Sequence, residues 1–215
     1  MKNIILVSVV TVVCSYIVLS CNSKSTVTSE TDVSKPLMSH SDSMSAGKLQ
    51  SIGHVMTKMN EIKMTGDFDL DFATTMIVHH QAAIDMSKAQ IIQGASEGIK
   101  SKAQDIINEQ NVEIDQLQLF IKNYRVKEIK NPTTKDILSA MMKEMADKMN
   151  AITMTGNSDS DFVKLMIPHH ESAVKMAEAE LVYGKEVTLR KMAQQMITDQ
   201  NGEIVEFKAW VLNQK

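Results

Sequence analysis

Apolar residues recur at intervals of three and four along most of the chain, which is the spacing of amphipathic helices. The alternating Val, Thr and Tyr runs that would indicate strands are absent from the sequence. The pattern predicts three helical segments in each half of the chain: 49–63, 69–93 and 97–124, then 133–152, 159–183 and 185–213. Gly94 and Gly184 separate the second and third segments of each half, where glycine commonly ends a helix.

The second half of the chain repeats the first with a constant offset of 90 residues. Met-Ile-Val-His-His at 76–80 returns as Met-Ile-Pro-His-His at 166–170. An ungapped repeat indicates one structural unit used twice, and one helical hairpin cannot bury its apolar stripe alone. The predicted fold is therefore all-α: a four-helix bundle from two pseudo-symmetric helical hairpins, with additional short helices.

The N-terminal region predicts export and attachment to a membrane. Residues 1–20 have the positive start and apolar stretch of a signal peptide. The residues that end in Cys21 resemble a bacterial lipoprotein cleavage box, so we expect lipid on Cys21; the alternative is an ordinary signal peptide with an incidental cysteine. Residues 21–48 then form a flexible tether. The first repeat (49–124), a linker (125–132) and the second repeat (133–215) are expected to form one domain of a protein anchored in the cell envelope, facing the periplasm or the outer surface.

Charge and cysteine content narrow the functional classes. With 23 Lys and Arg against 26 Asp and Glu, the formal charge is −3, which argues against nucleic acid as a partner. Cys14 would leave with the signal and Cys21 would carry lipid, so no thiol would remain for a disulfide, a nucleophile or a metal site. Any soft metal ligand would then be one of the methionines, of which the full chain has 17 and the processed chain 16, although methionine also fills cores.

The repeated histidines occupy two different positions on their helix. At about 100° per residue, Met76, His79 and Met86 share one stripe, and His80 lies on its flank. The second repeat places its equivalents in the same way: Met166, His169, Met176 and His170. Two adjacent histidines therefore cannot have the same role.

The third segment of each repeat carries polar groups that could reach these histidines. Gln110 and Gln200 each interrupt an apolar stripe, and a buried amide needs a hydrogen-bond partner. We expect that partner to be His79 or His169. Glu113 and Glu203 lie on the flank of the stripe, where they could pair with His80 and His170 or orient a metal-bound ring from behind.

Imidazole and thioether together favour Cu(I), with Cu(II) accepted mainly by the imidazoles. Zinc is better served by thiolates or carboxylates, and a di-iron bundle uses a Glu three residues before the His, where Met76 and Met166 stand. We expect one site or a pair built from both repeats, with two further methionines one to two turns away as a secondary position. The primary set is Met76, His79, His80, Met166, His169 and His170, and the secondary pair is Met86 and Met176. The alternative is that the histidines are polar core residues held by Gln and Glu.

The repeated motif resembles the bacterial family catalogued as domain of unknown function 305. The matching residues of the first repeat are Asp71, Phe72, Met76, His79, His80, Ala83, Met86, Gln110, Glu113 and Ile114. Those of the second are Asp161, Phe162, Met166, His169, His170, Ala173, Met176, Gln200, Glu203 and Ile204. The resemblance implies a ferritin-like helical bundle in an exported protein, and an association with copper in some relatives.

The leading hypothesis is a lipid-anchored copper-binding protein, a buffer or carrier that meets a copper-transport or envelope protein. It is not expected to be an enzyme, because the sequence shows no nucleophile with a base, no paired carboxylates and no phosphate loop. Two alternatives stay open. One is a helical lipoprotein that binds a partner protein without metal, and the other is a ferritin-like metal-dependent oxidoreductase.

Overall fold

The protein is all-α, as predicted. The computed structural model describes residues 57–58, 61–126 and 133–214, and no strand occurs within these ranges. The helices are α2 (Phe68–Gln93), α3 (Glu97–Asn123), α4 (Thr133–Ala151), α5 (Ser158–Tyr183) and α6 (Val187–Leu212). Their bounds lie within two residues of the predicted ones. Cys21, the tether and most of the expected helix 49–63 lie outside the described residues.

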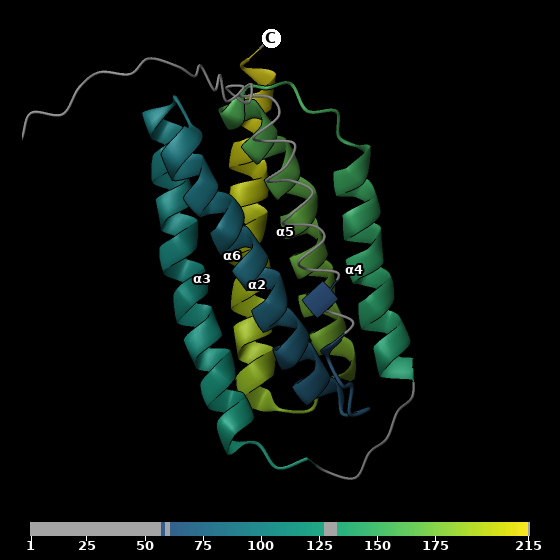
Figure 1. Cartoon of the computed structure of the whole chain (residues 1–215). Helices are drawn as coiled ribbons and strands as arrows, with labels where there is room; N and C mark the ends of the chain where they lie inside the picture. Colours follow the sequence, from purple (N-terminus) through teal and green to yellow (C-terminus); the bar gives the residue numbers. More distant parts are fainter. Residues whose placement is uncertain (1–56, 59–60, 127–132, 215) are drawn as a thin grey trace, which may run out of the picture. The chain divides into compact units, whose positions relative to one another are not determined.

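The four long helices form two antiparallel hairpins that pack together (Figure 1). Helix α2 pairs with α3 and α5 pairs with α6, while α2 and α5 form the contact between the hairpins. The shorter α4 packs beside α5. The predicted bundle of two hairpins with an additional short helix is therefore confirmed for the described part of the chain. This arrangement places the histidine-bearing helices, α2 and α5, at the centre.

A repeated turn fixes the start of each central helix. Asp71 accepts hydrogen bonds from the backbone N–H and the hydroxyl of Thr65, at 2.7 and 2.8 Å, and from the N–H of Gly66, at 2.9 Å. Gly66 has a φ of 84°, a left-handed conformation that favours glycine. Asp161 makes the equivalent bonds in the second repeat, where Gly156 has a φ of 80°. The aspartate of the repeated Asp-Phe motif thus stabilises the turn before its own helix by hydrogen bonds.

Each hairpin turn is also held by an aspartate from the other half. Asp69 in α2 accepts hydrogen bonds from the backbone N–H groups of Lys185 and Glu186, both at the α5–α6 turn, at 2.9 and 2.8 Å. Asp159 in α5 accepts from the N–H of Ser96 at the α2–α3 turn, at 2.9 Å. These reciprocal bonds fix the hairpins relative to one another and so fix the register of α2 against α5.

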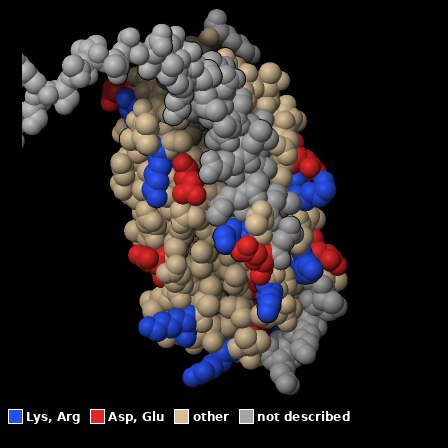
Figure 2. Space-filling view, viewed as in Figure 1, with Lys and Arg blue, Asp and Glu red and all other residues tan. Residues whose placement is uncertain are grey.

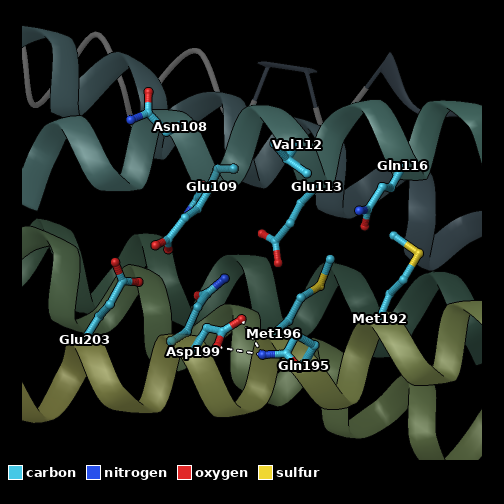
Figure 3. Close-up of a pocket in the computed structure, with 12 residues that line it drawn as sticks. Asn108, Glu109, Val112, Glu113, Gln116, Met192, Gln195, Met196, Asp199 and Glu203 are labelled. Carbon is cyan, nitrogen blue, oxygen red and sulfur yellow. Dashed lines mark hydrogen bonds between the residues drawn. The ribbon is translucent and has the colours of Figure 1, made fainter.

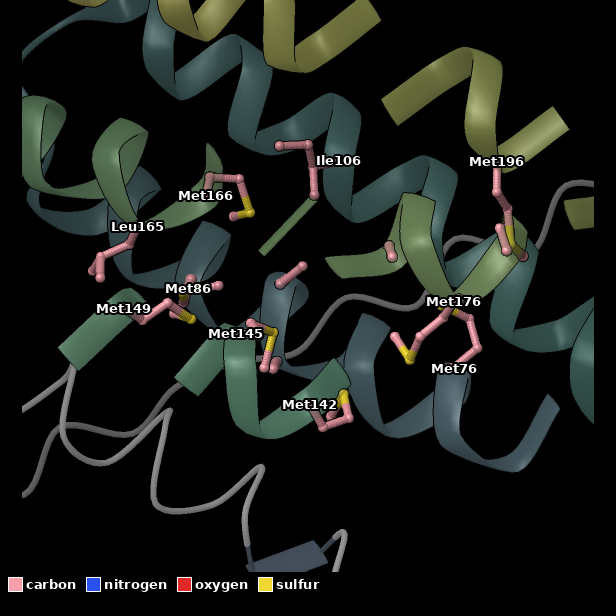
Figure 4. Close-up of a cluster of buried hydrophobic side chains, with 14 of the residues drawn as sticks. Met76, Met86, Ile106, Met142, Met145, Met149, Leu165, Met166, Met176 and Met196 are labelled. Atoms are coloured by element: carbon pink, nitrogen blue, oxygen red, sulfur yellow. The ribbon is translucent and has the colours of Figure 1, made fainter. Parts of the chain in front are cut away.

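The core between the helices is rich in methionine (Figure 4). Its buried methionines are Met76, Met86, Met142, Met145, Met149, Met166, Met176 and Met196. On the face shown in Figure 2, acidic and basic side chains are interspersed rather than gathered by sign. Within the described ranges, every helix is too short or too polar to cross a membrane.

Candidate metal centre

Two histidines from different halves of the chain meet where α2 and α5 pack together. The ring centroids of His79 and His169 are 3.8 Å apart, and the ring planes are tilted by 41°. Both side chains are completely buried. The offset of 90 residues makes His169 the counterpart of His79 in the second repeat. Because α2 and α5 pack antiparallel, these two counterparts come into contact. The imidazoles therefore converge inside the bundle, as the metal hypothesis requires.

The second histidine of each pair turns toward a glutamate of the neighbouring helix. Nε2 of His80 lies 2.9 Å from Oε2 of Glu113 in α3, and Nε2 of His170 lies 2.8 Å from Oε2 of Glu203 in α6. Both imidazoles are fully buried, while the carboxylates are partly exposed. The predicted pairing of Glu113 with His80 and of Glu203 with His170 is confirmed, while different roles for the adjacent histidines stay a prediction. A ring fixed in this way keeps a defined orientation, as in histidine ligands held by a carboxylate.

The predicted bonds from Gln110 and Gln200 to the central histidines are wrong. Among the described residues, neither ring nitrogen of His79 or His169 has a hydrogen-bond partner of ordinary geometry, and Oε1 of Gln110 has none either. Both amides instead line a groove between α3 and α6. A helical wheel gives the face of a residue but not which neighbouring helix its polar atoms meet, and here both amides lie at the space between α3 and α6.

The central imidazoles are held in their neutral form. Burial lowers the pKa of His79 well below its usual range, and the neighbouring rings of His169 and His80 lower it further. Burial and the ring of His170 lower the pKa of His169 in the same way. A neutral imidazole has a free lone pair and can bind a metal. The neutral forms of His79 and His169 therefore leave one ring nitrogen of each able to act as a metal ligand.

The methionines of the motif lie in the same core as the histidines. Met76, Met166 and Met176 are fully buried, and Met86 is 8% exposed. Met76 from α2 and Met176 from α5 point toward one another (Figure 4). Within the described ranges, no three His, Cys, Asp or Glu side chains converge into a closed metal site.

The family model described as "Domain of unknown function (DUF305)" matches residues 20–121 and again 122–211. The chain belongs to the DUF305 family. No curated protein sequence matches it.

Two solved structures share the helical fold of this DUF305 chain. One is "CopM in the Cu(II)-bound form", which is 25% identical, with a TM-score of 0.54; the match covers 68% of this chain and 97% of CopM. The other is a DUF305 fragment from Deinococcus radiodurans, which is 21% identical, with a TM-score of 0.50 and coverage of 69% and 97%. The second comparison supports the fold alone.

Sequence reasoning missed a second set of residues in this DUF305 chain. Glu109 and Asp199 line the groove between α3 and α6, each directly before one of the two glutamines. A signal for them was present, because the acidic residue before the glutamine occurs in both repeats at the offset of 90.

Proposed function

We propose that this DUF305 protein binds copper, with Cu(I) preferred, between the imidazoles of His79 and His169. The observation that carries the proposal is the pair of fully buried, neutral imidazole rings from the two halves of the chain, whose centroids lie 3.8 Å apart. A cation that bridges the two halves would use the lone pairs that the fold leaves free.

The surrounding side chains favour copper over other metals. Thioethers select Cu(I), and all four methionines of the repeated motif are buried in the hydrophobic core of the bundle. Zinc sites are usually completed by thiolates or carboxylates, whereas the carboxylates nearest to this site are engaged with His80 and His170. These outer histidines complete the candidate ligand set, or position the inner rings through their glutamate contacts.

The copper-bound relative supports the choice of metal. CopM shares the fold of this chain at 25% identity and is described in a Cu(II)-bound form. Imidazole ligands accept Cu(II) as well as Cu(I), so the same pair can hold either oxidation state.

A buffer or carrier suits the buried position of the site better than an enzyme does. All four imidazoles are shielded from solvent, which protects a held ion from water and from exchange. In this proposal, lipid on Cys21 anchors the protein in the bacterial cell envelope, where it passes copper to or from a transport protein. Binding of a partner without metal is the less favoured alternative, because it leaves the burial of four imidazoles in the middle of the bundle unexplained.

The test is a Cu(I) titration of the full chain against a chromophoric copper chelator. Wild type is expected to withdraw one Cu(I) with high affinity, and His79→Ala with His169→Ala should lose that binding. Gln104→Ala with Gln194→Ala is the control, because it changes two exposed side chains at equivalent positions on α3 and α6. Equal Cu(I) affinity in wild type and in the His79/His169 variant would contradict the proposal.

A further inference from the structure

A groove of about 390 Å³ separates α3 from α6 on the outside of the bundle. In Figure 3, Glu109 and Glu113 reach from α3 toward α6, and Glu203 reaches from α6 toward α3. Neither lysine nor arginine is among the described residues that line the groove. The groove is therefore an acidic space with no basic side chain on its walls.

The two repeats contribute the same three groups to this groove. Each outer helix carries an acid, an amide directly after it, and a glutamate three residues further on. The set is Glu109, Gln110 and Glu113 on α3, with Asp199, Gln200 and Glu203 on α6. Because α3 and α6 run antiparallel (Figure 1), the two sets face one another across the groove. Duplication has thus gathered four carboxylates and two amides in one place.

The charges of these carboxylates act on one another. Burial raises the pKa of Glu109, and the charges of Glu203 and Asp199 raise it further. Asp199 accepts a hydrogen bond from Gln195 at 2.8 Å on its own helix, which leaves part of its acceptor capacity free. Like charges held this close repel one another, and a bound cation would relieve that repulsion.

The two amides supply a separate observation that points to a ligand. Gln110 and Gln200 are each only 3% exposed and line the floor of the groove. Among the described residues, Oε1 of Gln110 and both polar atoms of Gln200 lack a hydrogen-bond partner. Buried polar atoms are almost always satisfied, so these oxygens should have a partner that the chain does not supply.

We propose that the α3–α6 groove is a second cation site, which takes a divalent ion that prefers oxygen ligands, such as Mn²⁺ or Ca²⁺. Glu109 and Asp199 supply carboxylate oxygens, and Gln110 and Gln200 supply amide oxygens. Carboxylates and carbonyls are the ligands of such ions. With two carboxylates and two amides as ligands, the ion keeps several of its waters. The site is distinct from the buried imidazole pair and does not depend on copper binding there.

The experiment is a Mn²⁺ titration of the full chain, followed by the loss of the electron paramagnetic resonance signal of the free aqua ion. Wild type is expected to bind Mn²⁺, and Glu109→Gln with Asp199→Asn should weaken binding at least tenfold. Both substituted side chains are exposed, so folding should be retained and can be checked by circular dichroism. Gln110→Ala with Gln200→Ala should weaken binding as well.

Two controls separate this site from general charge effects and from the copper proposal. Asp136→Asn with Glu178→Gln removes the same charge from exposed positions outside the groove and should leave Mn²⁺ binding unchanged. His79→Leu with His169→Leu should abolish tight Cu(I) binding and leave Mn²⁺ binding intact. Absence of Mn²⁺ binding by wild type, or unchanged binding after the Glu109 and Asp199 substitutions, would overturn the groove site and show that it holds water only. Neither result would affect the Cu(I) titration.

Discussion

The buried carboxyl group of Glu180 in α5 lies beside the carboxylate of Asp69 in α2, and this contact keeps a proton on Glu180. Burial and this contact raise the pKa of Glu180 to about 9. The equivalent residue in the first repeat is Gln90, whose amide Nε2 donates to Oδ1 of Asp159 at 2.5 Å. The protonated acid thus occupies the position that an amide fills in the other half, and both pairs join α2 to α5.

This relationship predicts how stability depends on pH. The folded chain holds a proton on Glu180 up to pH of about 9, whereas an unfolded glutamate releases it near pH 4.5. The contribution of Glu180 is therefore fully present below about pH 4.5 and is lost as the pH rises through about 9. Glu180→Gln should raise the free energy of unfolding at pH 8 by about 2 kcal/mol and flatten its decline between pH 5 and 9. Urea unfolding across that range measures both, and the exposed Glu178→Gln serves as control. A variant whose pH profile parallels wild type would contradict the shared proton.

The reciprocal aspartate bonds predict a large loss of stability when one of them is removed. Asp159→Ala leaves the amide of Gln90 and the backbone N–H of Ser96 without their acceptor. We expect a loss of about 2–4 kcal/mol in the free energy of unfolding, because the bonds to a buried carboxylate are charge-assisted. Asp85→Ala, which removes an exposed acid on α2, should change stability by less than about 0.5 kcal/mol. Similar urea midpoints for the two variants would show that the turns are held by other contacts.

Substitution by alanine at two glycines should change the stability of the fold in opposite directions. At Gly184 an added Cβ would lie 2.6 Å from the carbonyl oxygen of Glu180, whereas at Gly202 in α6 it would meet nothing within 4 Å. Gly184→Ala should therefore destabilise the fold by about 1–3 kcal/mol. Gly202→Ala should stabilise it by about 0.5–1 kcal/mol through higher helix propensity. Thermal unfolding of both variants checks the pair, and a shift of the same sign in both would contradict the geometry of the α5–α6 turn.

The central histidines should behave as functional rather than stabilising residues. His79→Leu with His169→Leu replaces two unpartnered buried polar rings by apolar side chains of similar size. We expect the metal-free protein to keep its stability or gain about 1–2 kcal/mol. The stabilisation that Cu(I) gives to wild type should disappear. A loss of several kcal/mol in the metal-free variant would favour histidines that serve the fold alone.

The sequence alone could predict the helices and much of the site. Helix bounds followed from the three-to-four spacing of apolar residues, because burial of one face requires that period. The same period placed His79 on the central stripe and His80 on its flank, and the contact of His80 with Glu113 followed from the faces of two adjacent helices. The offset of 90 residues predicted that the halves pair.

The other features of the fold and the site could not be predicted, because they depend on distances between helices that a local sequence pattern does not give. The hydrogen bond between Asp69 and Lys185 joins residues 116 positions apart. The sequence around either residue contains no pattern that would identify the other as its partner. Gln110 was expected to reach His79, but α3 and α6 stand far enough apart to open a groove along its side chain. The shared proton of Glu180 arises from burial beside a second acid, which appears only once the chain is folded.

The most direct test of the copper centre is anomalous diffraction at the copper edge from crystals of the Cu(I)-loaded protein. The account predicts a single strong peak within bonding distance of one ring nitrogen of His79 and one of His169, with methionine sulfur completing the coordination. A copper peak bound only to surface groups, with the two imidazoles still in contact and unligated, would contradict it.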